Sequence, residues 1–122
     1  MRGIDRVTAI LPCNDLDASE AFYARLGFVR NGYDETYRIL RHDGGAELHL
    51  TKAVEGWLVR GRNPFALYVH AEDVDGLAAR IGPLVLHPPK DQPWGMYEFA
   101  LSDPDETLVR VGRPTKNAKM RE

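Results

Sequence analysis

The chain has 122 residues, of which 43% are hydrophobic and 28% are charged, so it is long enough to fold as one globular domain. Its apolar runs are far shorter than the roughly 20 residues of a membrane-spanning helix, and we therefore expect no membrane partner. The formal net charge is −2. Because the tail from Arg113 onward is basic, the rest of the chain is acidic, which argues against nucleic acid as a partner.

The N-terminus and the cysteine content indicate where the protein resides. The N-terminal segment lacks the long apolar stretch and the small-residue cleavage site of a signal peptide. Cys13 is the only cysteine, so the chain cannot form an internal disulfide. We expect a cytoplasmic protein in which Cys13 is a buried packing residue.

The first elements are a strand and a helix. Residues 4–13 alternate loosely between apolar and polar side chains and are rich in β-branched residues, which predicts a strand. Asp17 is a candidate N-cap for the next helix, and Glu20 stands where it completes a capping box. Apolar residues recur at helical spacing up to Leu26, and Gly27 suits the left-handed conformation that ends many helices.

After this helix the pattern continues with strands and then repeats. Turn residues separate three predicted strands, 28–32, 36–41 and 46–52. The second copy comprises a strand at 65–71, a short helix lined by Val74, Leu77, Ala78 and Ile81, and strands at 84–87, 94–101 and 107–112.

The chain therefore consists of two strand–helix–three-strand half-repeats. They span about residues 4–52 and 64–113 within a single domain, 1–113. Residues 114–122 form a basic tail that we expect to be flexible. The fold class is α+β.

Two motifs resemble a known superfamily. Residues 15–17 (Asp-Leu-Asp) and 21–28 (Ala-Phe-Tyr-Ala-Arg-Leu-Gly-Phe) look like the opening of vicinal-oxygen-chelate proteins, a group that includes glyoxalase I, extradiol dioxygenases and bleomycin-binding proteins. The Asp-Pro-Asp turn at 103–105 resembles that group's Asp-Pro-Asp-Gly turn, with Glu106 in place of glycine. The resemblance covers about residues 4–112. It implies curved mixed sheets that form a cupped crevice, completed in a homodimer.

Many members of this superfamily hold a catalytic metal ion with one ligand from each of four strands. The resemblance places these positions at Thr8, His49, Ala66 and Arg110. Only His49 can coordinate a metal ion, whereas a catalytic site needs about three protein ligands. Arg110 adds a permanent positive charge where the ion would lie. We therefore expect neither a metal nor another cofactor.

This loss of ligands, together with Arg110, is similar to the bleomycin-resistance branch of the superfamily. In that branch a flat part of the antibiotic lies between an aromatic side chain from each of two subunits. The matching residues are Trp94, in the Pro-Trp-Gly-Met segment 93–96, and Tyr37, in the third strand. The resemblance thus implies a homodimer that sequesters a flat, cationic small molecule of the bleomycin class without chemistry.

The expected ligand-binding set extends beyond the two aromatic residues. It comprises Tyr37, Trp94, Glu47, His49, Glu98 and Arg110. The candidates for neutralising the positive charges of a ligand are Asp34, Glu35, Glu47 and Glu98. Large aromatic rings bind a planar cation by stacking and by cation–π attraction.

Two other functions remain open at this point. One is a glyoxalase-type or dioxygenase-type enzyme with a non-standard metal site around His49 and Glu98, and the other is a dimeric scaffold without a small ligand. Bleomycin-resistance proteins also carry a proline that supports exchange of the N-terminal strand between subunits. Ala9 stands at that position here, with Pro12 nearby, so we do not expect strand exchange.

Overall fold

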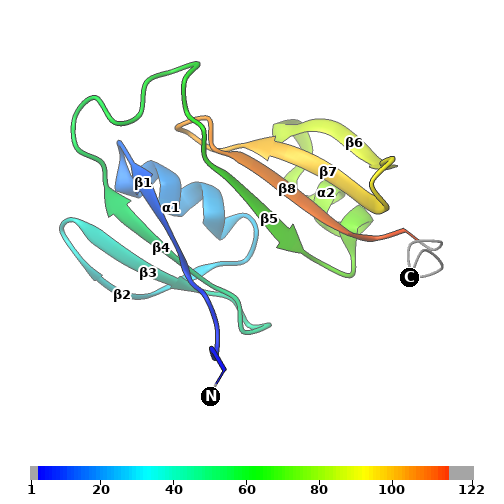
Figure 1. The fold of residues 1–122 in the computed structure, drawn as a ribbon, viewed down its shortest axis with the longest axis horizontal. Coiled ribbons are helices and arrows are strands. Elements are labelled where there is room, and N and C mark those ends of the chain that lie inside the picture. The colour runs from blue at the N-terminus through cyan, green and yellow to red at the C-terminus, as the bar shows by residue number, and fades with distance from the viewer. Residues whose placement is uncertain (1–2, 116–122) are drawn as a thin grey trace. The chain divides into compact units, whose positions relative to one another are not determined.

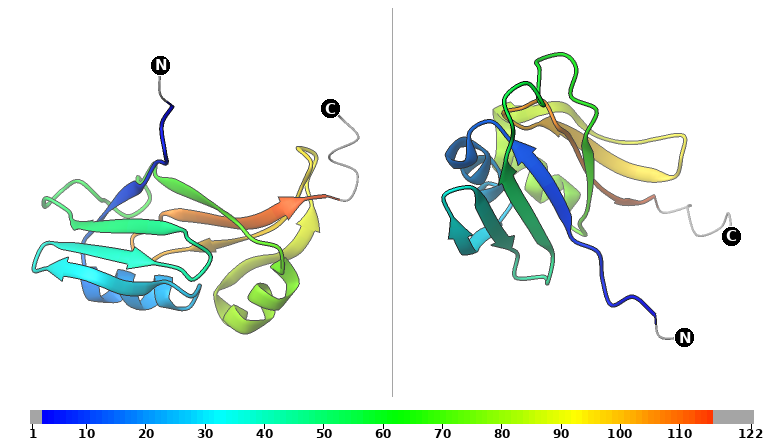
Figure 2. Two further views of the ribbon diagram at one scale, coloured as in Figure 1. Left: turned by 90° about the horizontal axis from the view of Figure 1, so that it is seen from below. Right: turned by 60° about the vertical axis from the view of Figure 1, so that its left-hand side comes forward.

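The computed structural model describes residues 3–115 and divides the chain into two compact units, Met1–Arg62 and Asn63–Glu122 (Figure 1). Each unit contains one four-stranded mixed sheet and one α-helix that covers one face of that sheet, as Figure 2 shows from two further directions. The half-repeats and the α+β class predicted from the sequence are confirmed. Most of the predicted basic tail, residues 116–122, lies outside the described residues. No helix among residues 3–115 is long and apolar enough to cross a membrane.

The first unit has the strand order β1-β4-β3-β2, in which β1 runs parallel to β4 and the other neighbours are antiparallel. Its elements are β1 (Ala9–Cys13), α1 (Leu16–Ala24), β2 (Val29–Asp34), β3 (Tyr37–Arg41) and β4 (Glu47–Lys52).

The second unit repeats this topology with the order β5-β8-β7-β6, and β5 runs parallel to β8. Its elements are β5 (Ala66–His70), α2 (Val74–Ile81), the short 3₁₀ helix η1 (Gly82–Leu84), β6 (Val85–Asp91), β7 (Met96–Ser102) and β8 (Leu108–Pro114).

The start of α1 differs from the prediction, which placed the N-cap at Asp17. Asp15 caps the helix, since its carboxylate accepts a hydrogen bond from the backbone N–H of Ala18 at 3.1 Å. Glu20 does not complete a capping box. Its carboxylate accepts hydrogen bonds from Arg30 on β2 and Arg38 on β3 at distances down to 2.6 Å, so it ties the helix to the sheet.

Two strand boundaries also differ from the prediction. β6 continues through Pro88 and Pro89 to Asp91, because it is an edge strand whose register shifts at this point, where a missing N–H is tolerated. β7 begins at Met96 rather than at Trp94. Trp94 therefore lies in the turn between β6 and β7, where Gly95 has a φ of 88°.

The alternation of side chains along the central strands positions the site. Leu48 and Leu50 of β4 are buried on the side of α1, and Val109 and Val111 of β8 are fully buried in the second unit. Because successive side chains of a strand point to opposite faces, the residues between them lie on the face opposite the helix of the same unit. We call this face of each sheet the open face.

Candidate functional site

On the open face of the first sheet, three predicted site residues form a hydrogen-bonded chain. The hydroxyl of Tyr37 lies 2.6 Å from Nδ1 of His49, and Nε2 of His49 lies 2.7 Å from a carboxylate oxygen of Glu47. Glu47 and His49 are two residues apart on β4 and so share a face, while Tyr37 comes from the neighbouring strand β3. The rings of Tyr37 and His49 meet edge to face with centroids 5.3 Å apart.

Glu47 is also held by two arginines. Nε of Arg41 lies 2.9 Å from its carboxylate, and Arg6 lies 3.9 Å away. The hydrogen bonds with His49 and Arg41 hold the pKa of Glu47 below its usual value. The carboxylate is thus already neutralised by protein groups, which leaves it poorly suited to balance the charge of a ligand.

On the open face of the second sheet, a second cluster surrounds Glu98. This side chain is only 1% exposed. Its Oε1 accepts a hydrogen bond from the hydroxyl of Tyr68 at 2.8 Å and another from Nε1 of Trp94 at 3.0 Å. Its Oε2 lies 3.8 Å from Nε of Arg110. A buried carboxylate requires such partners, because an unpaired buried charge is strongly destabilising.

Trp94 is anchored and exposed at the same time. Its indole nitrogen is bonded to Glu98, yet 54% of the residue's surface remains exposed. The guanidinium of Arg110 lies over the ring, 5.5 Å from its centroid, within the range of a cation–π contact. A large aromatic surface with a fixed polar edge is well suited to stack against a flat ligand.

Tyr68 is the site residue that the sequence analysis missed. The motif spacing pointed to Ala66, but the β5–β8 register pairs Ala66 with Leu108 and Tyr68 with Arg110. Burial and the hydrogen bond to Glu98 raise the pKa of Tyr68, so its hydroxyl remains a donor. The signal that could have identified it is the alternation of β5, which puts Tyr68 on the same face as Ala66.

The site residues do not fit the metal ion that the enzyme alternative requires. Both ring nitrogens of His49 are engaged, one by Tyr37 and the other by Glu47. Glu98 is engaged by Tyr68 and Trp94, and Arg110 is a permanent cation. Within residues 3–115, no group of three or more histidine, cysteine, aspartate or glutamate side chains is arranged to hold a metal ion.

The remaining candidate acids, Asp34 and Glu35, lie at the β2–β3 turn. Asp34 accepts hydrogen bonds from the backbone and the hydroxyl of Thr36, and the backbone bond in particular lowers its pKa. Its carboxylate therefore stabilises the turn.

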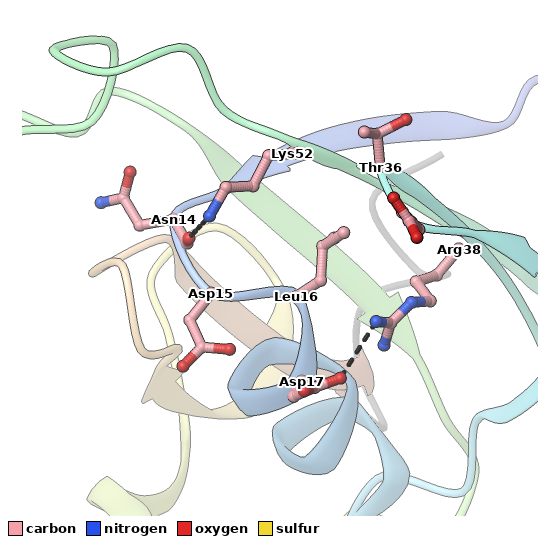
Figure 3. Close-up of a pocket in the computed structure, with 8 residues that line it drawn as sticks. Asn14, Asp15, Leu16, Asp17, Thr36, Arg38 and Lys52 are labelled. Carbon is pink, nitrogen blue, oxygen red and sulfur yellow. Dashed lines mark hydrogen bonds and ion pairs between the residues drawn. The ribbon is translucent and has the colours of Figure 1, made fainter.

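A hollow of about 510 Å³ opens beside this turn and the start of α1 (Figure 3). It is lined by Asn14, Asp15, Leu16, Asp17, Glu35, Thr36, Arg38 and Lys52. Arg38 is paired with Asp17 at 3.0 Å, and Lys52 donates to the backbone oxygen of Asn14. Both cations of the hollow are thus already engaged by the protein.

Comparisons with known proteins give a consistent result. Residues 3–111 match the model of the Glyoxalase/Bleomycin resistance protein/Dioxygenase superfamily. A bleomycin resistance protein from Geobacillus stearothermophilus is 32% identical in an alignment 126 positions long, gaps included, which covers 88% of this chain and 95% of the relative. A bleomycin resistance protein from Klebsiella pneumoniae is 32% identical in an alignment of 114 positions, which covers 88% of this chain and 90% of the relative.

Solved structures agree with these relatives. A bleomycin-binding protein complexed with bleomycin superimposes with a TM-score of 0.77 at 28% identity, covering 90% of this chain and 98% of that one. A bleomycin resistance determinant encoded on the transposon Tn5 gives a TM-score of 0.78 at 28% identity, and the match covers 92% of this chain and 99% of that one.

Proposed function

We propose that this chain, which belongs to the Glyoxalase/Bleomycin resistance protein/Dioxygenase superfamily, sequesters bleomycin, or an antibiotic of the same chemical class, without modifying it. The observation that carries the proposal is the likeness to bleomycin resistance proteins along 88% of the chain. A structural neighbour in complex with bleomycin supports the same ligand class. The single cysteine is consistent with action in the cytoplasm.

Binding is favoured over catalysis because the polar side chains that a metal ion would need are already hydrogen-bonded to other side chains. The enzyme alternative relies on His49 and Glu98 as metal ligands, but hydrogen bonds with neighbouring side chains already engage both. Affinity in a binding protein comes instead from buried apolar area and from rigid aromatic surfaces. Trp94 supplies such a surface on the open face of the second sheet.

We propose further that residues 1–113 act as a single functional domain. Two copies of this domain form a homodimer, and the ligand binds at their interface. Tyr37 of one subunit and Trp94 of the other would stack on a flat part of the ligand, with Arg110, His49 and Glu47 at the edge of the site. A two-fold interface gives two equivalent crevices.

Calorimetric titration of the purified protein with metal-free bleomycin tests the function. We expect saturable binding with one drug molecule per chain, and recovery of the drug with unchanged mass by mass spectrometry. The same preparation should contain well under one equivalent of zinc, nickel, iron or manganese per chain, because three of the four family ligand positions cannot coordinate a metal.

Two results would contradict the proposal. One is the absence of bleomycin binding at micromolar concentrations by folded protein. The other is a stoichiometric metal whose removal abolishes, and whose return restores, turnover of a substrate, which would favour the enzyme alternative.

A further inference from the structure

The cluster around Glu98 is built from three separate segments of the second unit. Tyr68 comes from β5, Glu98 from β7, and Trp94 from the turn that precedes β7. The two hydrogen bonds from Tyr68 and Trp94 converge on the same carboxylate oxygen, Oε1. Such convergence on a side chain that is 1% exposed fixes the positions of both donors.

We propose that Glu98 and Tyr68 are positioning residues that hold the indole of Trp94 in the orientation that the ligand requires. This inference rests on the proposed function, since it takes Trp94 as the ligand-contacting group. It also replaces the expectation that Glu98 neutralises a positive charge of the ligand. Holding a large side chain in its bound orientation removes part of the entropy cost of ordering it when the ligand binds.

The burial of Glu98 argues against a direct contact with the ligand. Its Oε1 already accepts two hydrogen bonds, and its Oε2 faces Arg110 at 3.8 Å. A ligand cation could reach this carboxylate only by displacing Trp94 or Arg110 from it. The carboxylate of Glu98 therefore interacts with protein groups, of which Trp94 is exposed while Tyr68 and Arg110 are half-buried.

The backbone around the cluster is shaped to fit it. Gly112 stands opposite Glu98 in the β7–β8 register. A Cβ at position 112 would collide with the hydroxyl of Tyr68 and would come within 2.7 Å of Cβ of Glu98. The turn that carries Trp94 is closed by hydrogen bonds from Gln92 to Met96 at 2.8 Å and from Gly95 to Gln92 at 3.0 Å. Hydrogen bonds thus fix both the backbone turn that carries Trp94 and the indole ring itself.

The experiment measures the mobility of Trp94 and the affinity for metal-free bleomycin in the same variants. Trp57, in the segment between the half-repeats, is first replaced in Trp57→Phe so that Trp94 is the only tryptophan. Glu98→Ala removes the acceptor, Tyr68→Phe removes one donor, and Glu98→Gln keeps an acceptor oxygen without the charge. Time-resolved fluorescence anisotropy then reports motion of the indole without any drug.

We expect Glu98→Ala to increase the fast motion of Trp94 and to weaken drug binding roughly threefold to tenfold, the change expected when one large side chain must be ordered on binding. Tyr68→Phe should show a smaller effect of the same kind. Glu98→Gln, unlike Glu98→Ala, should keep the anisotropy of the parent and an affinity within about twofold of it, because its amide oxygen accepts the same hydrogen bonds.

Tyr97→Phe is the matched control. Tyr97 is next to Glu98 on β7 and also donates its hydroxyl to a carboxylate, that of Asp75 on α2, on the other face of the sheet. This variant should leave the motion of Trp94 and the affinity unchanged.

Two outcomes would overturn the inference. If Glu98→Gln weakened binding as much as Glu98→Ala while Trp94 stayed immobile, the charge itself would be the important property. If the anisotropy were the same in all variants, Glu98 would not position Trp94. The anisotropy measurement needs no ligand, so it remains decisive even if the parent protein fails to bind bleomycin, which would be a failure of the proposed function alone.

Discussion

Trp94 has an anchored nitrogen and an exposed ring, and this combination makes its contribution measurable. Losing a whole indole from a binding site costs about 2 kcal/mol or more, and each ~1.4 kcal/mol is a factor of ten in affinity. We therefore expect Trp94→Ala to weaken bleomycin binding roughly thirtyfold, measured by calorimetry.

The control is Trp57→Ala, because Trp57 is 60% exposed and lies outside both clusters. It should leave the affinity unchanged. Thermal denaturation beside each titration separates loss of the site from loss of folded protein. A folded Trp94→Ala protein that bound the drug as tightly as the parent would show that the site lies elsewhere.

The residues of the two clusters were foreseen from the sequence to different degrees. Trp94, Arg110 and His49 were recognisable because they stand in or near motifs with fixed spacing. The role of Glu98 was not, since an acidic side chain in a strand looks the same in a sequence whether it faces solvent or is buried. Its buried carboxylate accepts a hydrogen bond from Tyr68, which lies on another strand 30 residues earlier in the chain.

At the scale of elements, Glu20 joins α1 to the sheet of the first unit. Hydrogen bonds from Arg30 and, secondly, from Arg38 lower the pKa of Glu20 below its usual value of 4.5. A lowered pKa in the folded state means that this carboxylate stabilises the fold at pH values above 4.5, and that the stabilisation is lost as the pH falls through the folded-state pKa.

Glu20→Gln should therefore lower the melting temperature at neutral pH, and the difference from the parent should shrink at pH values below about 4.5. Melting curves of both proteins across the acidic range provide the measurement. Glu55→Gln, at an exposed glutamate outside this network, is the control and should show no such difference. If the difference in melting temperature stayed constant with pH, packing rather than charge would explain the lower melting temperature of Glu20→Gln.

The helix starts show why the sequence predicted the elements better than their ends. The segment 15–17 offers two aspartates, and either one has the spacing of an N-cap. The choice falls on Asp15 because Leu16 is buried and must already belong to the helix. The second unit repeats this arrangement, with Asp73 as the cap of α2. Periodicity indicates that a helix exists, whereas burial decides where it begins.

At the scale of the whole molecule, the open face of the first sheet carries apolar side chains that a partner could cover. Ile10 is 55% exposed and pairs with His49, and Val29 is 67% exposed and pairs with Arg41. Exposed apolar residues grouped on one face are typical of interaction surfaces. We accordingly expect sedimentation to give a mass near twice 13.7 kDa at micromolar concentration.

Ile10→Asp should shift the protein toward the monomer, because it places a charge on this face. Val54→Asp, at another exposed apolar residue outside the sheet, should not. A parent protein that remained monomeric and still bound bleomycin would contradict the interface site that we propose.

The reactivity of Cys13 toward thiol reagents can be used to measure how often the edge of the first sheet opens. Among the strands that the structure describes, β1 is an edge strand paired with β4, and its last residue, Cys13, is 0% exposed. A thiol reagent can reach this sulfur only while the end of β1 is detached from the sheet. Under native conditions the labelling rate therefore measures how often the strand opens, and slower labelling in the presence of drug would show that the ligand tightens a strand that it need not touch.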